Sequence, residues 1–583
     1  MRILLLHPED GPLEGPWAWQ RWDAVFDLGR GGESARERWS HSFGCPVNPL
    51  DDLKPDNREI SKVRELLKAG LGRLVDEEGL DWWELTAIEI HERLESLVRL
   101  RELVDELPPQ ADVSLSRGGF YAEVLKPLLG TRLHVIPGNE VAAQKRLRHY
   151  WNRLRQLPMA HVLQTLGDKY DMGYRVRRHF HRRPLRGTKP LVLLPSPYVN
   201  VSRLGVAYAR LLPEMDFLLA STRSSGRLPE VPANVRQVWL AAYAPGTDTT
   251  REYRDLLSRW EKLKRELIAI EEWRMAEGFG LLANIPRHFA AGLAVREAWR
   301  QVLEAEPVQA VLCGDDSNPQ AHIPLLLARK RGLPVVTCHH GALDGRHLIK
   351  ISHADVILAK GRMEQDYLVH VCGVKNSVVE IGAPGALPQR PRTDASGDTI
   401  VYFSEPYEMA LGRTQEFYRD ILPGLAELSR RHGKKLVLKL HPSENLENRR
   451  KIMQAVLTRE DCERIEIVNG GLTDALLDRT WFGITVLSSV VVDCTVRGIP
   501  CFVCSWLNCW PYGYVDQYRK FGVGIGLKAP AEIANIPERM ASFRPSPEAA
   551  AACWESITPE RLREILSKSN ATVVAGSQSW HSS

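Results

Sequence analysis

The chain has 583 residues, of which 44% are hydrophobic and 26% charged. This composition is typical of a folded protein of several domains and excludes collagen-like and largely disordered chains. The net charge of +5 is mild, and no DNA- or RNA-binding motif accompanies it, so no nucleic-acid partner is expected.

The ten cysteines are scattered through the chain, which suits a reducing compartment better than a disulfide framework. No stretch approaches the ~20 apolar residues that span a bilayer. The first apolar run, residues 2–6, is too short for a signal peptide. We therefore expect a cytoplasmic protein, either free or peripheral at the inner membrane face.

The first predicted domain covers residues 1–140. Short apolar runs at residues 2–7, 24–28, 112–116 and 132–136 alternate with helical patterns, which predicts a compact α/β domain. The glycine-rich turn at residues 27–32 lacks the full dinucleotide fingerprint, so it does not indicate a nicotinamide site.

A basic helical connector is predicted over residues 141–189. Its densest part, residues 175–189, has two readings. It is either a solvated linker, as charge runs usually are, or a contact with an anionic membrane face or acidic polymer, to which each Lys or Arg adds ~1 kcal/mol.

Two further α/β domains are predicted, at residues 190–385 and 396–545, with a C-terminal helix and flexible tail at residues 546–583. One helical stretch is expected from about residue 249 to 304. A turn-rich segment at residues 382–391 indicates a hinge. The alternation of strands and helices predicts parallel sheets with right-handed crossovers. The expected fold class is therefore α/β, with two Rossmann-like domains facing a cleft behind an additional N-terminal α/β domain.

Polar residues follow three predicted strands of the last domain, where open α/β sheets bind ligands. They are Ser404, Glu405, His441, Pro442, Ser488 and Ser489. A histidine at a strand end can donate to a phosphate oxygen, and serines at a helix start lie beside backbone N–H groups that attract anions. The structural alternatives are a histidine that caps the turn and a serine N-cap.

The other Rossmann-like domain carries the candidate base. Asp315 and Asp316 follow a strand, and an acid there can deprotonate an acceptor hydroxyl. Alternatively, Asp316 caps the next helix. His339 and His340 end the following strand and are rival bases or phosphate contacts.

The motifs Thr337-Cys-His-His-Gly341, Leu438-Lys-Leu-His-Pro442 and Leu487-Ser-Ser489 resemble those of GT-B glycosyltransferases that build bacterial capsules and surface polysaccharides. That group includes Kdo transferases, polysialyltransferases and glycerophosphotransferases that use cytidine-diphosphate glycerol. The resemblance covers roughly residues 190–530. It implies that His441 and Pro442 contact the donor phosphate and that the serines close around phosphate or sugar. Asp493 stands where many GT-B enzymes have a ribose-binding Glu.

The resemblance implies a metal-independent glycosyltransferase that moves a sugar or glycerophosphate from a cytidine- or uridine-linked donor to a surface polysaccharide or lipid-linked glycan. No cofactor is expected beyond the nucleotide-activated substrate. Cys501 and Cys504 lie on opposite strand faces, so they are expected to be core thiols rather than zinc ligands. The alternatives are a GT-B-fold sugar-nucleotide epimerase and a non-catalytic nucleotide-binding protein.

Overall fold

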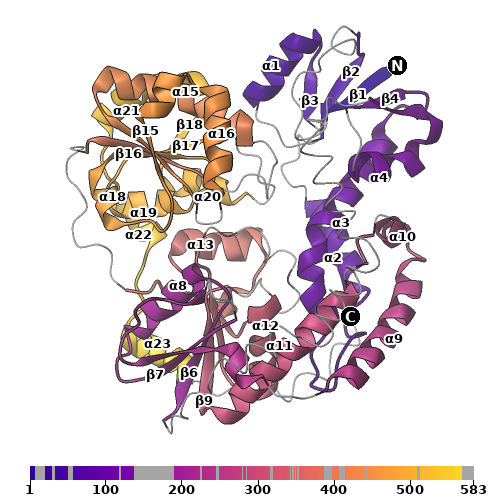
Figure 1. Ribbon diagram of the computed structural model, residues 1–583, viewed down its shortest axis with the longest axis vertical. Helices are drawn as coiled ribbons and strands as arrows, with labels where there is room; N and C mark the ends of the chain where they lie inside the picture. The colour runs from indigo at the N-terminus through magenta and orange to yellow at the C-terminus, as the bar shows by residue number, and fades with distance from the viewer. Residues whose placement is uncertain are drawn as a thin grey trace.

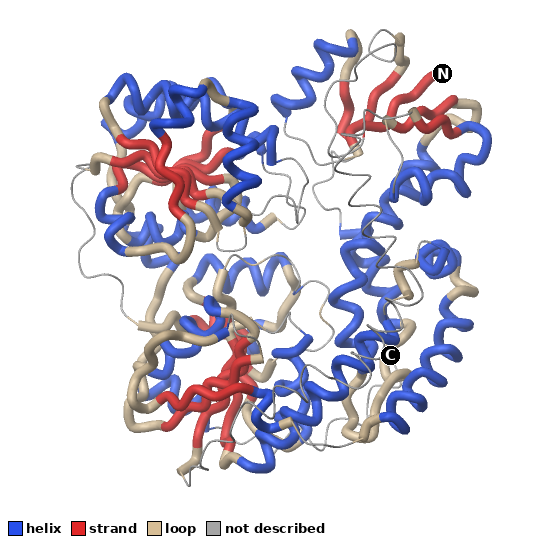
Figure 2. The backbone as a smooth tube through the Cα atoms, in the orientation of Figure 1, coloured by secondary structure: helices blue, strands red, loops and turns tan. Residues whose placement is uncertain are grey.

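The structure, a computed structural model, describes residues 1–6, 20–28, 33–49, 57–116, 120–136, 189–222, 226–244, 248–278, 280–283, 285–315, 319–341, 343, 347, 350, 354–385, 397–405, 414–441, 444–507 and 513–567. Within these ranges the strands form three parallel sheets with helices on both faces, as Figure 2 shows. The predicted class, two Rossmann-like domains preceded by another α/β domain, is confirmed. No helix in these ranges is long and apolar enough to cross a membrane.

The N-terminal sheet has the strand order β3-β2-β1-β4-β5. Its strands are β1 (Arg2–Leu6), β2 (Ala24–Asp27), β3 (Val47–Pro49), β4 (Asp112–Leu115) and β5 (Leu133–Val135), with the helices α1 (Glu33–Phe43) and α4 (Phe120–Leu129). The apolar run of β1 is fully buried from Ile3 to Leu6, as expected for a parallel strand covered on both faces. The short β3 was not predicted.

Helix α3 (Trp82–Glu106) joins this domain to the next one, and α2 (Asn57–Lys68) packs beside it. Figure 1 shows α3 running from the N-terminal sheet to the helices of the middle domain. At its start, Trp82 packs edge-on against Phe289, with ring centroids 6.1 Å apart, and Trp83 stacks on Trp260. Near its end, Leu103 joins the core of the N-terminal sheet.

The middle sheet has the order β12-β11-β10-β9-β6-β7-β8. Its strands are β6 (Leu191–Ser196), β7 (Asp216–Ser221), β8 (Val235–Trp239), β9 (Val308–Cys313), β10 (Val335–Cys338), β11 (Val356–Ala359) and β12 (Val379–Ile381). Its helices include α8 (Val199–Ala209), α12 (Pro319–Lys330) and α13 (Arg362–Asp366).

The single helical stretch expected over residues 249–304 is wrong. Three helices occupy it: α9 (Thr250–Leu267), α10 (Glu271–Gly278) and α11 (Ile285–Ala305). Gly280 has φ +69° between the last two, and a left-handed residue of this kind ends a helix.

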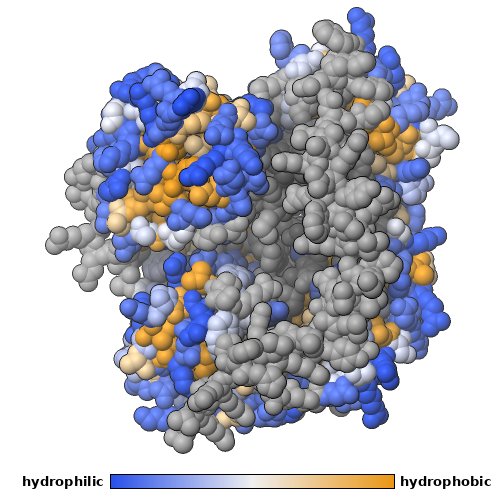
Figure 3. All heavy atoms as spheres, in the orientation of Figure 1, coloured by the Kyte–Doolittle hydropathy of each residue, from blue (hydrophilic) through white to orange (hydrophobic). Residues whose placement is uncertain are grey.

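The C-terminal sheet has the order β15-β14-β13-β16-β17-β18. Its strands are β13 (Thr399–Phe403), β14 (Lys435–Lys439), β15 (Ile465–Val468), β16 (Thr480–Thr485), β17 (Cys501–Cys504) and β18 (Ile525–Leu527). The helices are α15 (Thr414–His432), α16 (Leu446–Val456), α17 (Arg459–Arg464), α18 (Asp474–Arg479), α19 (Val490–Val496), α20 (Tyr514–Phe521) and α21 (Ile536–Ser542). On the face seen in Figure 3, hydrophobic residues gather over the middle of this domain, with hydrophilic residues around them.

The chain then returns to the middle domain through α22 (Pro547–Cys553) and α23 (Pro559–Ser567). Ile557 N–H donates to Ala383 O at 3.0 Å, beside the end of β12. Leu562 and Leu566 of α23 are buried against the middle sheet, where Figure 1 shows this helix. The last helix is therefore part of the core of the middle domain.

Candidate functional site

Each Rossmann-like domain has one point where the strand order reverses: between β6 and β9 in the middle domain and between β13 and β16 in the C-terminal domain. The connections that follow the two strands at this point run to opposite sides, so a crevice opens beyond the carboxyl ends of the strands. Open α/β sheets bind ligands in this crevice. Asp315 lies at the first of these switch points, and Ser404, Glu405, Ser488 and Ser489 lie at the second.

At the middle-domain switch point, the end of β6 contacts the end of β9. The Tyr198 hydroxyl donates a hydrogen bond to Oδ2 of Asp315, whose side chain is buried. Asp315 thus lies at the end of a strand, as predicted. Tyr198, which is 117 positions away in the sequence, fixes the orientation of its carboxylate. Asp316 lies outside the described residues.

The two candidate histidines end β10, one strand further along the sheet. The His340 ring packs edge-on against Tyr198 at 5.2 Å and lies 4.9 Å from the His339 ring. Burial, and then the charge of His339, lower the pKa of His340 to about 3, against the opposing effect of Asp315. His340 is therefore neutral at pH 7, and its buried Nδ1 has no hydrogen-bond partner among the described residues.

At the C-terminal switch point, the end of β13 contacts the end of β16. Leu487 N–H donates to Oε2 of Glu405 at 3.1 Å, and Ser488 gives a second hydrogen bond to this carboxyl. Burial raises the pKa of Glu405 to about 8. The negative charge of Glu444 adds to this rise, and the two hydrogen bonds oppose it. Glu405 is therefore mostly protonated at pH 7.

Behind these strand ends lies a buried network centred on Glu444. Its carboxylate accepts from the Ser404 hydroxyl at 2.8 Å, from His441 N–H at 2.6 Å and from Arg449 Nε at 2.6 Å. The guanidinium of Arg449 also packs over the ring of Tyr418. The network fixes the ends of β13 and β14 relative to each other.

His441 lies at the end of β14, and part of the residue reaches solvent. Burial and the charge of Lys439 lower its pKa, which keeps a neutral ring with one N–H donor at pH 7. The ammonium of Lys439 donates to Leu440 O at 2.6 Å and Gly470 O at 2.7 Å. Pro442 lies outside the described residues.

The two serines lie before α19. Ser488 Oγ accepts from Val490 N–H at 3.4 Å, and Ser489 is the N-cap residue without a side-chain capping bond. Both are half-buried, and Asp493, inside α19, is exposed. Partial removal from solvent raises the pKa of Asp493, and Lys360 of the middle domain opposes this rise.

The two Rossmann-like domains meet beside these residues. The backbone of Gly471, after β15, approaches the guanidinium of Arg203 on α8 so closely that an added Cβ would lie 3.0 Å from it. Lys360 pairs with Glu364 at 2.8 Å, and Tyr514 of α20 donates to the same carboxylate at 3.4 Å. These contacts link the two switch-point domains directly.

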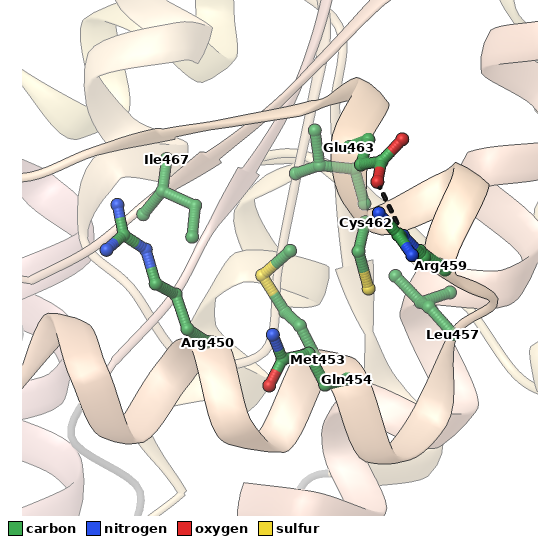
Figure 4. Close-up of a pocket in the computed structure, with 9 residues that line it drawn as sticks. Arg450, Met453, Gln454, Leu457, Arg459, Cys462, Glu463 and Ile467 are labelled. Atoms are coloured by element: carbon green, nitrogen blue, oxygen red, sulfur yellow. Dashed lines mark hydrogen bonds and ion pairs between the residues drawn. The ribbon is translucent and has the colours of Figure 1, made fainter.

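A separate groove of about 580 Å³ lies at the edge of the C-terminal sheet, between α16, α17 and β15 (Figure 4). Met453, Leu457 and Ile467 line its wall, and Arg459 pairs with Glu463 at its rim. The lining comes from the later turns of α16, whereas His441 precedes that helix, so the groove is not part of the candidate site. Within the described residues, no group of three or more His, Cys, Asp or Glu side chains is arranged to hold a metal ion.

Sequence reasoning missed Tyr198, Glu444 and Arg449. Tyr198 follows a buried strand, so a search for hydroxyls after every strand could have found it. Arg449 is 1% exposed and lies on the core-facing side of an amphipathic helix. Charged residues are rarely buried without a partner, so an arginine at such a position is a signal that a buried acid lies beside it.

No protein-family model matches this chain, and no curated protein matches it. Solved structures do resemble it at low identity. The UDP-GlcNAc 2-epimerase of Methanocaldococcus jannaschii, in complex with UDP-GlcNAc and UDP, is 12% identical with a TM-score of 0.41, covering 65% of this chain and 99% of that one. A variant of the wall teichoic acid polymerase TagF is 12% identical with a TM-score of 0.38, covering 72% and 96%.

The calicheamicin glycosyltransferase CalG4 is 12% identical with a TM-score of 0.36, covering 65% of this chain and 93% of that one. Because each TM-score is below 0.5, the proposed function rests on the residues of the site and on the resemblance of their motifs to those of surface-polysaccharide glycosyltransferases.

Proposed function

We propose that this protein is a metal-independent glycosyltransferase that moves a sugar or glycerophosphate from a cytidine- or uridine-linked donor to a surface polysaccharide or lipid-linked glycan. The observation that carries the proposal is the pair of polar switch points in adjoining domains. One holds a carboxyl oriented by Tyr198, and the other holds Glu405 beside hydrogen-bond donors.

The C-terminal switch point is the proposed donor side. The ring of His441 and the hydroxyls of Ser488 and Ser489 are the proposed phosphate contacts, with Asp493 at the ribose. Preorganised donors of this kind stabilise the charge that develops on a departing phosphate. They do so without a metal because the donors are fixed in place before the reaction.

The middle-domain switch point is the proposed acceptor side. Asp315 accepts the proton of the acceptor hydroxyl as that oxygen attacks the donor, and Tyr198 holds the carboxylate in position. Asp316, His339 and His340 remain rival bases in the proposal. The neutral, partnerless Nδ1 of His340 can accept a hydrogen bond from the acceptor.

The proposed partners are the nucleotide-activated donor and a glycan or lipid-linked acceptor, with a cytoplasmic location that includes peripheral contact with the inner membrane. The basic segment at residues 175–189 is the proposed membrane contact. Except for Lys189, it lies outside the described residues.

A thermal-shift screen against cytidine, uridine, guanosine and adenosine mono- and diphosphates tests the donor side, because a ligand that binds only the native state raises its apparent stability. We expect a shift for pyrimidine nucleotides that is lost in His441→Ala. His370→Ala is the matched control, since His370 is an exposed histidine of the other domain. No shift from any nucleotide would refute the proposal.

The reaction itself is tested by incubating the protein with cytidine- and uridine-activated sugars. A transferase or its slow hydrolytic side reaction releases free nucleotide. An epimerase would change the sugar and leave its bond to the nucleotide intact. Nucleotide binding without either change would identify a binding protein.

A further inference from the structure

Within the part of the chain that the structure describes, Glu405 lies at the donor-side switch point without a cation to neutralise it. Its carboxyl accepts from Leu487 N–H at 3.1 Å and from Ser488. The nearby guanidinium of Arg449 is bound to Glu444 at 2.6 Å and reaches Glu405 only at its main-chain carbonyl, at 3.5 Å. Among the described residues, no Lys or Arg forms an ion pair with Glu405.

Among the described residues, other charged or titratable groups around this carboxyl come from the end of β14 with its following turn, from α16 and from α20. Glu444 and Arg449 come from the turn after β14 and from α16, and His441 from the end of β14. Tyr518 comes from α20, where its hydroxyl lies 3.5 Å from Ser488 O. Burial and the charge of Glu444 both raise the pKa of Glu405, and the charge of Glu405 in turn raises the pKa of Tyr518.

A carboxylate at this place would repel the phosphates of a donor, because like charges a few ångströms apart and shielded from water are strongly unfavourable. A neutral carboxylic acid has the opposite effect, since its O–H donates to an anionic oxygen. Such a bond to a charged group is worth more than one between neutral groups.

We propose that Glu405 acts as a neutral carboxylic acid that donates a hydrogen bond to the donor phosphate and protonates it as the sugar leaves. This inference rests on the proposed transferase function with a sugar donor. The bond between the anomeric carbon and the phosphate oxygen breaks, and its electron pair stays on that oxygen. The Glu405 proton passes to the phosphate, and the acceptor oxygen bonds to the carbon while its proton passes to Asp315. Both acids exchange protons with solvent after the products leave.

The test is calorimetric titration with CMP between pH 7 and 9.5, where the ligand keeps a constant charge because its second phosphate pKa is near 6. UMP is compared at pH 7 alone, because its uracil N3–H ionises towards the top of this range. If only the protein with neutral Glu405 binds, affinity follows the protonated fraction. With a pKa of about 8, it falls roughly thirtyfold over this range. Glu405→Gln stays neutral and should bind with little dependence on pH.

The matched control is Glu447→Gln, because Glu447 is an exposed acid in the first turn of α16. It should keep the wild-type decline. Glu405→Asp, which keeps an acid, should also retain a decline, with weaker binding. At pH 7, Glu405→Gln should lower kcat for nucleotide release at least about tenfold, because the proton of Glu405 is transferred in the transition state. The KM should stay within about twofold of the wild-type value.

A Glu405→Gln protein that keeps the wild-type decline, or a wild type that binds equally well at pH 7 and 9.5, would overturn the acid role. It would leave the transferase proposal intact. Absence of CMP binding at every pH and of UMP binding at pH 7 would overturn both.

Discussion

The two switch points share one geometry and differ in their proton chemistry. In the middle domain, Asp315 accepts from the Tyr198 hydroxyl and lies near a neutral His340. In the C-terminal domain, Glu405 accepts from a backbone N–H and lies near another carboxylate, Glu444. If the proposed function holds, the neighbours one strand away, rather than the fold, decide whether a carboxyl at a switch point serves as a base or as an acid.

The largest effect is expected from removing the proposed base. Asp315→Asn should lower the rate of nucleotide release from activated sugars by roughly two to four orders of magnitude, the usual contribution of general base catalysis. CMP or UMP affinity should stay within about twofold, because the two functions lie in different domains. Parallel rate and calorimetric measurements check this. An equal loss of binding and rate would contradict the division between the domains.

The next largest effect is expected from breaking the buried ion pair between Arg449 and Glu444. Arg449→Met leaves the carboxylate of Glu444 buried without its cation, which costs roughly 3–5 kcal/mol of unfolding free energy. Urea denaturation followed by circular dichroism measures it. The neighbouring Arg450→Met is the control, because Arg450 is exposed and surface changes usually stay within about 0.5 kcal/mol. Equal effects of the two variants would show that the network is not a stabilising element.

The contributions of His340 and Glu405 to stability should also change in opposite directions with pH. The pKa of His340 is lowered from 6.5 to about 3, so its contribution is present above pH 6.5 and is lost as the pH falls towards 3. The loss is roughly 2 kcal/mol at pH 5. The pKa of Glu405 is raised from 4.5 to about 8, so its contribution is present below pH 4.5 and is lost as the pH rises through 8.

Melting temperatures from pH 4 to 9 measure both contributions. His340→Gln should change the slope of the profile only below about pH 6.5, and Glu405→Gln only between about pH 4.5 and 8. Variants whose profiles parallel the wild type would contradict these assignments.

The smallest effect is expected at the contact between the domains. Gly471→Ala places a methyl group 3.0 Å from the Arg203 guanidinium, which must move slightly. The transfer rate should fall by a few-fold, a loss of about 1 kcal/mol, with nucleotide affinity unchanged. Gly278→Ala, where an added Cβ meets nothing within 4 Å, is the control and should leave the rate unchanged.

The sequence predicted most strands of this protein because buried parallel strands form continuous apolar runs between turn signals. The sequence also placed Asp315, Glu405 and His441 at strand ends, because each of them follows such an apolar run. It did not predict the strands Val47–Pro49 and Ile525–Leu527, because Asn48 and Gly526 interrupt them and leave no continuous apolar run.

The contacts that give the site its chemistry depend on the order of strands in the sheets. Glu405 lies beside Leu487 because β16 rather than β14 pairs with β13 on that side, and Tyr198 meets Asp315 because β6 pairs with β9. Partners 82 and 117 positions apart leave no local pattern in the chain. The pKa of Glu405 follows from this tertiary arrangement, so sequence reasoning identified the residue and not its protonation state.

The most direct test of the account is a crystal structure of the protein with CMP or UMP bound. We expect the phosphate within hydrogen-bond distance of the His441 ring and the Glu405 carboxyl, at the switch point between β13 and β16. A nucleotide bound instead at the switch point between β6 and β9, or in the N-terminal domain, would contradict the assignment of donor and acceptor sides.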